Sequence, residues 1–341
     1  MLLRIFLSYT VESAEKDNKN TDMQHTADSV NPATERRLHH LEKIVAVFAL
    51  CAVFALTAGF AQAGGPKAKK KPAAQTDEQM LDQMQRAHPD KVFLRSNAVL
   101  VQDAASGLTV LEKNGDSVVP IASITKLMTA MVVLDRGLDL EQRVVISEDD
   151  LDTLKGTRSR LRPGSVVTRG ELMLLALMAS ENRAAHALGR AYPGGIQAFV
   201  DAMNAKAQLL GMNDSRFADP TGLSSANVSS PRDLAKLVLA AHEYPAIRDF
   251  STRDAATVTV QGQELAYQNT NGLVRAGTWS IGLSKTGFIN EAGRCLVMRA
   301  RVAGRDLVLV LMDSWGKQSR IGDANRIRKW LEANSVRRPA S

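Results

Sequence analysis

Alternating hydrophobic and polar positions in two separate parts of the chain predict β-strands at both ends of the folded region. On the N-terminal side, residues 97–101 and 108–111 are rich in Val and Leu and are joined by a turn at Ala105-Ser106-Gly107. On the C-terminal side, strand-like runs lie at 256–268, 279–288, 294–303 and 306–312. Strands at both ends of a chain predict an antiparallel sheet that the two ends complete together.

The middle of the chain has helical periodicity instead. The pattern predicts helices at 123–135, 169–179, 183–191, 194–210 and 231–243, with a closing helix at 322–333. Two of these helices have clear start signals: Thr168 and Glu171 form a capping box, and Ser230 precedes Pro231 at the first helical position. We therefore predict an α+β fold with two lobes, an antiparallel sheet flanked by helices and an all-helical lobe, with a cleft between them for a site.

The first 90 residues follow neither pattern. Residues 1–40 form a polar extension without periodicity, which suggests a misassigned start. Residues 41–63 contain a continuous apolar run followed by Ala61-Gln62-Ala63, which indicates a signal peptide or an N-terminal anchor. Residues 64–90 are expected to be a flexible basic linker. The sequence thus predicts export to the periplasm, with loose inner-membrane association through the N-terminus as a further option.

Composition and charge narrow the class of partner. The 341 residues carry a net charge of +7 and are 45% hydrophobic, which is ordinary for a globular protein. Four lysines within residues 67–71 are typical of a solvated linker. No predicted helix or strand interleaves Arg with aromatic residues as base contact requires, so nucleic acid is not expected as a partner. Cys295 lies in an apolar stretch, which predicts a buried, unreactive thiol.

Three short motifs carry the candidate chemistry. They are Ser123-Ile124-Thr125-Lys126, Ser180-Glu181-Asn182 and Lys285-Thr286-Gly287. Chance copies of the first two patterns occur, such as Ser225-Ala226-Asn227, whereas the Lys-Thr-Gly string occurs once. The order and the local context of the three motifs therefore make the set specific, although the first two motifs are weak by themselves.

The first motif pairs a hydroxyl with a candidate base. Pro120 comes shortly before Ser123, so this serine is expected near the start of a helix, with Lys126 one turn further on the same face. A serine hydroxyl needs a base to become a nucleophile. His186 and His242 lie in amphipathic helices, where a structural role is expected.

Lys126 can act as that base only if its amine is neutral. A lysine pKa near 7 instead of about 10.4 requires on the order of 4–5 kcal/mol. Partial burial and a second cation nearby can supply this free energy, and Lys285 is the candidate for the second cation.

The second motif interrupts a helical run, as a loop that presents polar groups into a cleft would. Ser180 could relay a proton between the base and the leaving amine, and Asn182 could bond a substrate amide.

The third motif lies on a probable edge strand. Lys285 and Thr286 suit a peptide carboxylate, and Gly287 leaves space where substrate would approach closely. The backbone N–H groups of Ser123 and Phe288 are expected to form an oxyanion hole. No metal ligands cluster in the sequence, and neither a metal nor another cofactor is expected.

On these motifs the chain resembles the low-molecular-mass penicillin-binding D,D-peptidases, and among them the D-alanyl-D-alanine endopeptidases of the penicillin-binding protein seven type. The resemblance runs from about Val92 to Leu331. Beyond the three motifs it is carried by Pro120-Ile121-Ala122, Met178-Ala179, Arg183-Ala184-Ala185, Asp219-Pro220-Thr221-Gly222-Leu223-Ser224, Leu283-Ser284 and Phe288 through Cys295.

The resemblance implies a β-lactamase/D,D-peptidase-like fold and a serine D,D-peptidase catalytic domain over residues 91–335. It implies acylation of Ser123 by peptidoglycan peptide stems and covalent inhibition by β-lactam antibiotics. Cleavage of cross-links is the preferred activity, and D-alanyl-D-alanine carboxypeptidase activity is the alternative. A class A β-lactamase is disfavoured because the chain lacks a Glu-x-x-Leu-Asn string. A non-catalytic penicillin-binding scaffold is disfavoured because every expected catalytic residue is present.

Overall fold

The computed structural model describes residues 77–88 and 91–335. The expected polar extension (1–40), the signal peptide or anchor (41–63) and residues 64–76 of the expected linker lie outside the described residues. Within the two described ranges, no helix combines the length and the apolar character needed to cross a bilayer.

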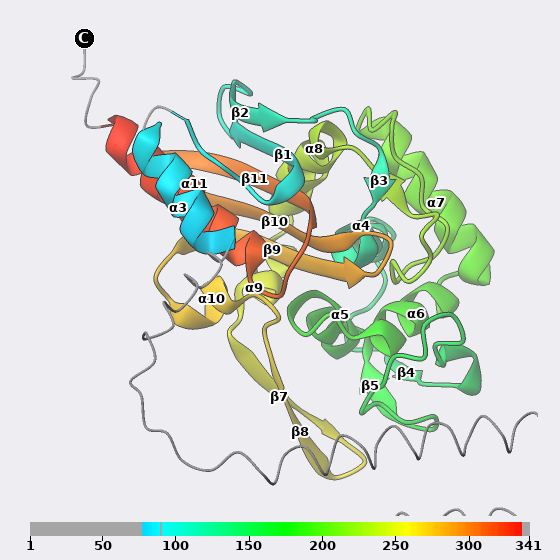
Figure 1. Cartoon of the computed structure of the whole chain (residues 1–341). Helices are drawn as coiled ribbons and strands as arrows, with labels where there is room; N and C mark the ends of the chain where they lie inside the picture. Colours follow the sequence, from blue (N-terminus) through cyan, green and yellow to red (C-terminus); the bar gives the residue numbers. More distant parts are fainter. Residues whose placement is uncertain (1–76, 89–90, 336–341) are drawn as a thin grey trace, which may run out of the picture. The chain divides into compact units, whose positions relative to one another are not determined.

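A five-stranded antiparallel sheet has the order β2-β1-β11-β10-β9 (Figure 1). Its strands are β1 (Ser96–Asp103), β2 (Thr109–Lys113), β9 (Ser280–Ile289), β10 (Gly293–Val302) and β11 (Arg305–Ser314). β1 pairs with β11 so that Val99 lies opposite Leu311. The two ends of the chain therefore complete the sheet together, as the sequence predicted. β2 and β9 are its two edge strands.

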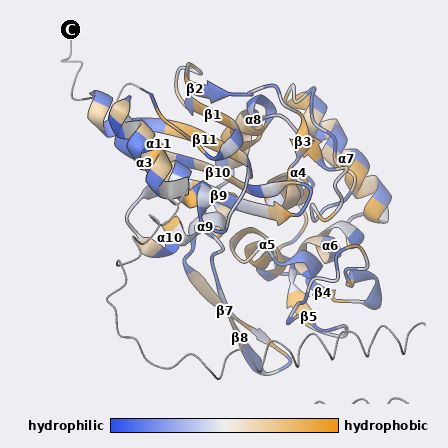
Figure 2. Ribbon diagram, viewed as in Figure 1, coloured by the Kyte–Doolittle hydropathy of each residue, from blue (hydrophilic) through white to orange (hydrophobic). Residues whose placement is uncertain are grey.

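The side chains of these strands alternate between two cores. Val101 and Leu309 pack on one face with Leu331 of helix α11 (Ser319–Ser335). Leu100 and Val310 lie on the opposite face, in the core that also contains helix α8 (Pro231–His242). Figure 2 shows hydrophobic residues along the central strands. Full burial of one such side chain contributes about 1.5–3 kcal/mol, so helices are held on both faces of the sheet.

A second group of elements follows β2 in the chain and forms the helical region. It contains β3 (Val119–Pro120), the 3-10 turn η1 (Ala122–Thr125), α4 (Lys126–Asp135), β4 (Arg143–Val145), η2 (Glu148–Asp150), β5 (Val166–Thr168), α5 (Arg169–Met178), α6 (Asn182–Arg190), α7 (Gly195–Leu209) and β6 (Val228–Ser229). Met131, Leu175 and Phe199 are fully buried among its helices. Every helix predicted between 123 and 210 is present, although the first begins with a 3-10 turn.

Both predicted helix starts are confirmed. The hydroxyl of Thr168 accepts a hydrogen bond from the backbone N–H of Glu171, and the carboxylate of Glu171 accepts one from the backbone N–H of Thr168. At the start of α8, the hydroxyl of Ser230 accepts from the N–H of Asp233, and Pro231 takes the first helical position.

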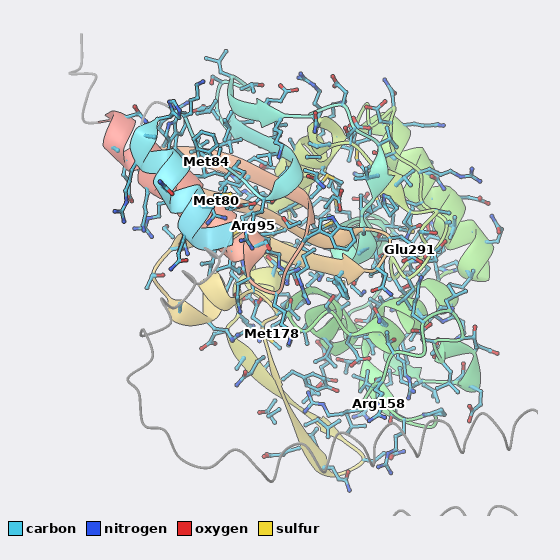
Figure 3. The ribbon with its side chains drawn as sticks, in the orientation of Figure 1. Met80, Met84, Arg95, Arg158, Met178 and Glu291 are labelled. Atoms are coloured by element: carbon cyan, nitrogen blue, oxygen red, sulfur yellow. The ribbon has the colours of Figure 1, made fainter. Side chains whose placement is uncertain are left out.

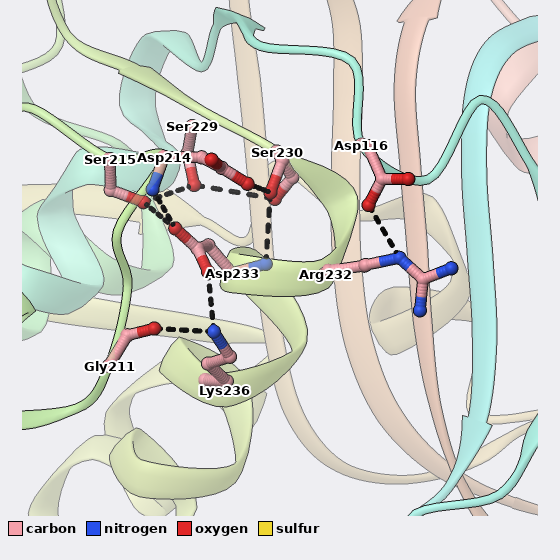
Figure 4. A network of polar contacts seen from close by, with 9 residues as sticks. All are labelled: Asp116, Gly211, Asp214, Ser215, Ser229, Ser230, Arg232, Asp233 and Lys236. Carbon is pink, nitrogen blue, oxygen red and sulfur yellow. Dashed lines mark hydrogen bonds and ion pairs between the residues drawn. The ribbon is translucent and has the colours of Figure 1, made fainter.

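Figure 4 shows how the start of α8 is fixed to the preceding loop. The buried carboxylate of Asp233 accepts from the N–H of Asp214 at 2.8 Å, from the hydroxyl of Ser215 at 2.9 Å and from Nζ of Lys236 at 2.7 Å. Because α8 packs against the sheet, this network joins the loop of residues 211–230 to the sheet.

The 256–268 segment and two short helices differ from the expectation. The single strand-like run is a separate hairpin, β7 (Ala255–Val260) and β8 (Gln263–Gln268), because Gln261 and Gly262 both have positive φ and reverse the chain. Helices α9 (Pro245–Thr252) and α10 (Gly272–Ala276) were not predicted, since one or two turns are too short for a periodic signal.

The expected flexible linker (64–90) also contains a helix, α3 (Asp77–Ala87). The spacing of Met80, Leu81 and Met84 places apolar groups on one side of this helix. They line a cavity of about 290 Å³ together with Arg95 and Trp315. Figure 3 labels Met80, Met84 and Arg95 among them. Part of the segment that we expected to be a flexible linker is therefore a helix, and its apolar side lines this cavity.

Candidate active site

Ser123 lies on η1, at a turn that the backbone of a second segment holds in place. Ala122, the preceding residue, has φ of +48°, a strained conformation for a residue with a side chain. Gly222 packs directly against it: a Cβ on Gly222 would lie 2.0 Å from the Ala122 carbonyl oxygen. Thr125 also donates its hydroxyl to that oxygen at 2.8 Å. These contacts over-determine the turn and so fix the position of the serine.

Lys126 points its amine at the serine from the first turn of α4. Its Nζ is 2.8 Å from Oγ of Ser123, and it donates to Oδ1 of Asn182 at 2.7 Å and to the carbonyl of Thr221 at 2.7 Å. The residue is fully buried, and all three partners are uncharged. The first and second motifs therefore meet at one amine.

Burial lowers the pKa of Lys126 from its ordinary value to about 7, and carboxylates at Asp219, Glu181 and Asp152 oppose the shift only in part. The neutral amine that a base requires is consequently accessible near neutral pH. The sequence prediction of a base at this position required such a shift, and the structure contains it. The required burial comes from the helical core around α4.

Ser180 and Lys285 form the other half of the site. Ser180 follows α5 with φ of +59°, and Nζ of Lys285 donates to its hydroxyl at 2.8 Å and to the carbonyl of Thr286 at 2.8 Å. Burial is the main reason that the pKa of Lys285 lies well below its ordinary value, and repulsion from Lys126 and Arg320 lowers it further. We expected partial burial and the charge of Lys285 to lower the pKa of Lys126 together, and burial is the cause of the shift.

The missing side chain of Gly287 has a reason that the sequence did not indicate. We expected it to leave space for substrate. A Cβ at this position would also lie 2.9 Å from the carbonyl oxygen of Ile121, 3.1 Å from Cβ of Ala122 and 3.2 Å from the nitrogen of Ser123. The glycine therefore lets β9 pack against the turn that carries the serine.

The neighbours of Gly287 on β9 lie in different surroundings. Thr286 is buried, and its hydroxyl is 2.6 Å from that of Thr270. Phe288 is 49% exposed, and the guanidinium of Arg294 lies 4.5 Å from its ring centroid. Arg320 of α11 donates to the carbonyl of Gly287 at 2.9 Å. An exposed aromatic ring at the end of the strand is therefore available to a ligand that lies along this edge.

Every residue proposed from the sequence lies at the junction of η1, α4, the α5–α6 turn and β9. The chance copy of the second motif, Ser225-Ala226-Asn227, is not part of this junction. Its buried Asn227 accepts from the N–H groups of Ala218 and Asp219 and donates to the hydroxyl of Thr125 at 3.2 Å, a structural role.

Several groups around the site were missed by the sequence analysis. The Thr221 carbonyl belongs to the Asp219–Ser224 stretch, which was noted only for its resemblance to the family. The contacts of Thr157, Thr270 and Arg320 had no sequence signal, because each depends on the tertiary arrangement.

The remaining candidate nucleophiles and ligands are structural. His186 bonds Asp150 at 2.7 Å, and His242 contacts Arg299 at 2.9 Å. Burial raises the pKa of the Cys295 thiol to about 11. Among the described residues, no group of three or more His, Cys, Asp and Glu is arranged to hold a metal ion.

The sequence of this chain is similar to those of known D-alanyl-D-alanine peptidases. A sequence profile of the family described as D-alanyl-D-alanine carboxypeptidase, peptidase S11, matches residues 83–316. A D-alanyl-D-alanine endopeptidase of Pseudomonas aeruginosa is 49% identical over 245 residues, which are 71% of this chain and 79% of the relative. A D-alanyl-D-alanine endopeptidase of Escherichia coli K12 is 46% identical over 245 residues, with the same shares.

The fold of this chain is also similar to that of a solved structure. The crystal structure of the Streptomyces K15 DD-transpeptidase superposes with a TM-score of 0.66 at 28% sequence identity, covering 71% of this chain and 99% of that one. The α+β fold predicted from the sequence, with its antiparallel sheet and helical lobe, is confirmed.

Proposed function

The chain belongs to the D-alanyl-D-alanine carboxypeptidase family, and from this premise we propose that it hydrolyses D-alanyl peptide bonds of peptidoglycan through an acyl-enzyme on Ser123. It is a serine-type D-Ala-D-Ala hydrolase. The observation that carries the assignment of Ser123 is its 2.8 Å contact with Nζ of a fully buried lysine, Lys126.

The contacts of Lys126 favour a role as base. A neutral amine has two hydrogens and one lone pair. The carbonyl oxygens of Asn182 and Thr221 can only accept, so they take the two hydrogens. The lone pair is then left for the hydroxyl proton of Ser123, and Oγ becomes able to attack the carbonyl carbon of D-alanine.

The leaving amine needs a proton when the peptide bond breaks. Ser180 lies on the Lys285 side of the site and is proposed to relay the proton from Lys126 to that amine. Water then attacks the acyl-enzyme, Lys126 accepts the proton of the water, and Oγ of Ser123 leaves with a proton. The covalent bond formed in the first step is thereby broken in the second.

The charge that develops on the carbonyl oxygen needs donors. We assign the backbone N–H groups of Ser123 and Phe288 to this role. The tight packing of Gly287 against the nitrogen of Ser123 supports this assignment, because it brings the end of β9 beside the serine. Asn182, Lys285 and Thr286 are proposed to bind the peptide on either side of the scissile bond.

Cleavage of cross-links is the activity that the relatives support best. The two relatives that are 49% and 46% identical are D-alanyl-D-alanine endopeptidases. Carboxypeptidase activity is the second candidate, because a D-alanyl-D-alanine carboxypeptidase of a Streptomyces strain is 32% identical over 242 residues. Both activities acylate the same serine and differ in the group that leaves.

Two experiments test the proposal. A fluorescent penicillin should label wild type and the Ser225→Ala variant, and should not label Ser123→Ala. Ser225 is an exposed serine in the chance copy of the second motif and is therefore a matched control. Purified cross-linked muropeptide dimers and pentapeptide monomers should then be digested side by side. Conversion of dimers to monomers supports an endopeptidase, whereas release of D-alanine alone would favour the carboxypeptidase.

The cell compartment follows from the substrate. We propose that the protein acts in the periplasm, where its peptidoglycan substrate lies, after export by the N-terminal apolar segment. Loose association with the inner membrane through that segment is part of the same proposal. Fractionation of cells that produce the full chain, with and without a salt wash, distinguishes a periplasmic protein from a membrane-bound one.

A further inference from the structure

The loop of residues 151–165 contacts the catalytic centre through a hydrogen-bond chain that the proposed reaction has not yet used. The hydroxyl of Thr157 is 3.0 Å from Nδ2 of Asn182, and Oδ1 of the same amide accepts from Lys126 at 2.7 Å. Asn182 thus has one end of its side-chain amide on the loop and the other on the lysine.

Asp152 holds the loop in the conformation that makes this contact. One carboxylate oxygen accepts from the N–H groups of Leu154 and Lys155, both at 2.9 Å. The other accepts from the N–H of Thr157 at 2.8 Å and from its hydroxyl at 2.6 Å. Four bonds to one side chain fix both the path of the loop and the rotamer of Thr157.

The direction of the chain follows from donor and acceptor chemistry. An ionised carboxylate only accepts, so the single hydroxyl proton of Thr157 goes to Asp152. Toward Asn182 the hydroxyl can then only accept, and it must face the NH₂ end of the amide. The carbonyl end is therefore turned to Lys126. An amide flipped by 180° would set its NH₂ group against the amine and leave Thr157 without a donor.

We propose that Asp152 and Thr157 are positioning residues that orient the Asn182 amide and thereby aim the lone pair of Lys126 at Ser123. This inference rests on the proposed function, since it concerns the same serine and lysine. If Asn182 did not accept a hydrogen from the amine, the amine could rotate and point that hydrogen at Ser123. The lone pair would then point at Ser123 in fewer molecules.

Asp152 has a second, electrostatic effect on the same amine. Its negative charge favours the protonated form of Lys126, as do the charges of Asp219 and Glu181. Removing the charge of Asp152 should therefore lower the pKa of Lys126. Thr157 has no charge, so its removal should not. Removal of Asp152 and removal of Thr157 can therefore be distinguished by whether the pKa of Lys126 changes.

The loop also contacts the sheet that carries the other half of the site. Lys155 forms an ion pair with Glu291, at the turn between β9 and β10. In Figure 3, Arg158 marks the loop and Glu291 marks that turn. The loop is thus held on one side by its own aspartate and on the other by the strand pair that ends beside Phe288.

The test measures the rate of penicillin acylation of Ser123 as a function of pH in the full chain. Thr157→Val should acylate about five- to tenfold more slowly, as expected for the loss of one orienting hydrogen bond, with an unchanged midpoint. Thr157→Ser should restore the rate, because it keeps the hydroxyl. Asp152→Asn should be slower and should also move the midpoint to lower pH.

Matched controls separate this role from general damage. Thr109→Val changes an exposed threonine on β2, and Asp116→Asn changes an exposed carboxylate that pairs with Arg232; both should match wild type. Far-ultraviolet circular dichroism and melting curves check that each variant folds. If Asp152→Asn fails to fold, the Thr157 pair still decides the question.

The outcomes that overturn the inference are distinct from those that overturn the proposed function. If wild type is not acylated at Ser123, the proposed function fails. If wild type is acylated but Thr157→Val reacts within twofold of it, or Thr157→Ser does not recover the rate, the positioning role is wrong. An unchanged midpoint in folded Asp152→Asn would remove the electrostatic part.

Discussion

Two buried clusters, one around Asp150 and one around Lys126 and Lys285, differ in whether the buried ionisable group has an oppositely charged partner. The side chain of Asp150 is fully buried but accepts from Nδ1 of His186 at 2.7 Å and from two nitrogens of Arg190 at 2.9 and 3.0 Å. Lys126 and Lys285 are buried to a similar degree. In the part of the chain that the structure describes, neither lysine forms an ion pair, and their hydrogen bonds go to uncharged oxygens.

The two clusters therefore respond differently to the same physical cost. Burial raises the pKa of the Asp150 carboxyl, but hydrogen bonds from His186 and Arg190 outweigh it, so the pKa stays below its ordinary value. Burial lowers the pKa of Lys126 to about 7, and the surrounding carboxylates do not reverse it. A buried charge with oppositely charged partners stays charged, and removing one of those partners destabilises the fold. A buried amine whose hydrogen bonds go only to uncharged oxygens loses its proton more easily and can become a base.

The largest expected effect comes from removing the unpaired amine. Lys126→Met should slow acylation of Ser123 by about 10²- to 10⁴-fold, the usual contribution of a general base. The matched control is Lys329→Met, at an exposed lysine of α11, which should acylate like wild type. Stopped-flow measurement with a chromogenic β-lactam gives both rates. Acylation of folded Lys126→Met at more than a tenth of the wild-type rate would show that another group takes the proton.

Substitution in the cluster around Asp150 should change the stability of the protein and not the rate of acylation. Asp150→Ala removes the acceptor shared by His186 and Arg190 and should lower the free energy of unfolding by about 2–3 kcal/mol. Urea denaturation measures this value. The acylation rate per folded molecule should stay within twofold of wild type. A large loss of rate in folded protein would mean that the two clusters are coupled.

The pH dependence of stability should distinguish the clusters further. The folded pKa of Lys126 is about 7 and its ordinary value is 10.5, so between these pH values the unfolded chain binds more protons. Stability should therefore rise with pH in this window, and Lys126 should contribute about 1 kcal/mol of the rise between pH 7 and pH 8. The pKa of Lys285 is also lowered and adds a rise of its own, so Lys126→Met should show a rise that is smaller by the Lys126 contribution in urea titrations. An equal rise in both proteins would refute the linkage.

Asp150 should act in a different window. Its folded pKa is lower than its ordinary value of 3.8, so its stabilising contribution is present above that value and is lost as the pH falls below it. The difference in the free energy of unfolding between wild type and Asp150→Ala should thus be constant from pH 5 to pH 8. A difference that changes within that range would assign the titration to another group.

The smallest expected effect is at the exposed ion pair between the lobes. Lys155 and Glu291 have side chains that are 30% and 43% exposed, so Glu291→Gln should change the free energy of unfolding by less than about 1 kcal/mol. A larger loss, measured by urea denaturation at low and high salt, would show that this bridge holds the lobes together.

Much of the site could be predicted from the sequence because its chemistry is local. The turn of helix between Ser123 and Lys126 fixes their separation, and the polar break at Ser180 is visible within an apolar helical run. The strand alternation also predicted an antiparallel sheet that the two ends of the chain complete. These features depend on spacing along the chain, which a sequence displays directly.

The remaining features depend on contacts between distant segments. Gly287 was explained by substrate, whereas its lack of a side chain accommodates the backbone of Ile121 and Ser123. The contact of Thr157 with Asn182 depends on a loop conformation that Asp152 creates. No periodicity or motif marks such a loop, so only a three-dimensional arrangement reveals it.

The most direct test of the account is the pH profile for acylation of Ser123 by a penicillin in the wild-type protein. If burial makes Lys126 the base, the rate constant should rise with pH through a midpoint near 7 and then level off, as the neutral amine becomes the main form. A profile that is flat from pH 5 to pH 9, or a midpoint near the ordinary lysine value of 10.5, would contradict the claim that an unpaired buried lysine activates the serine.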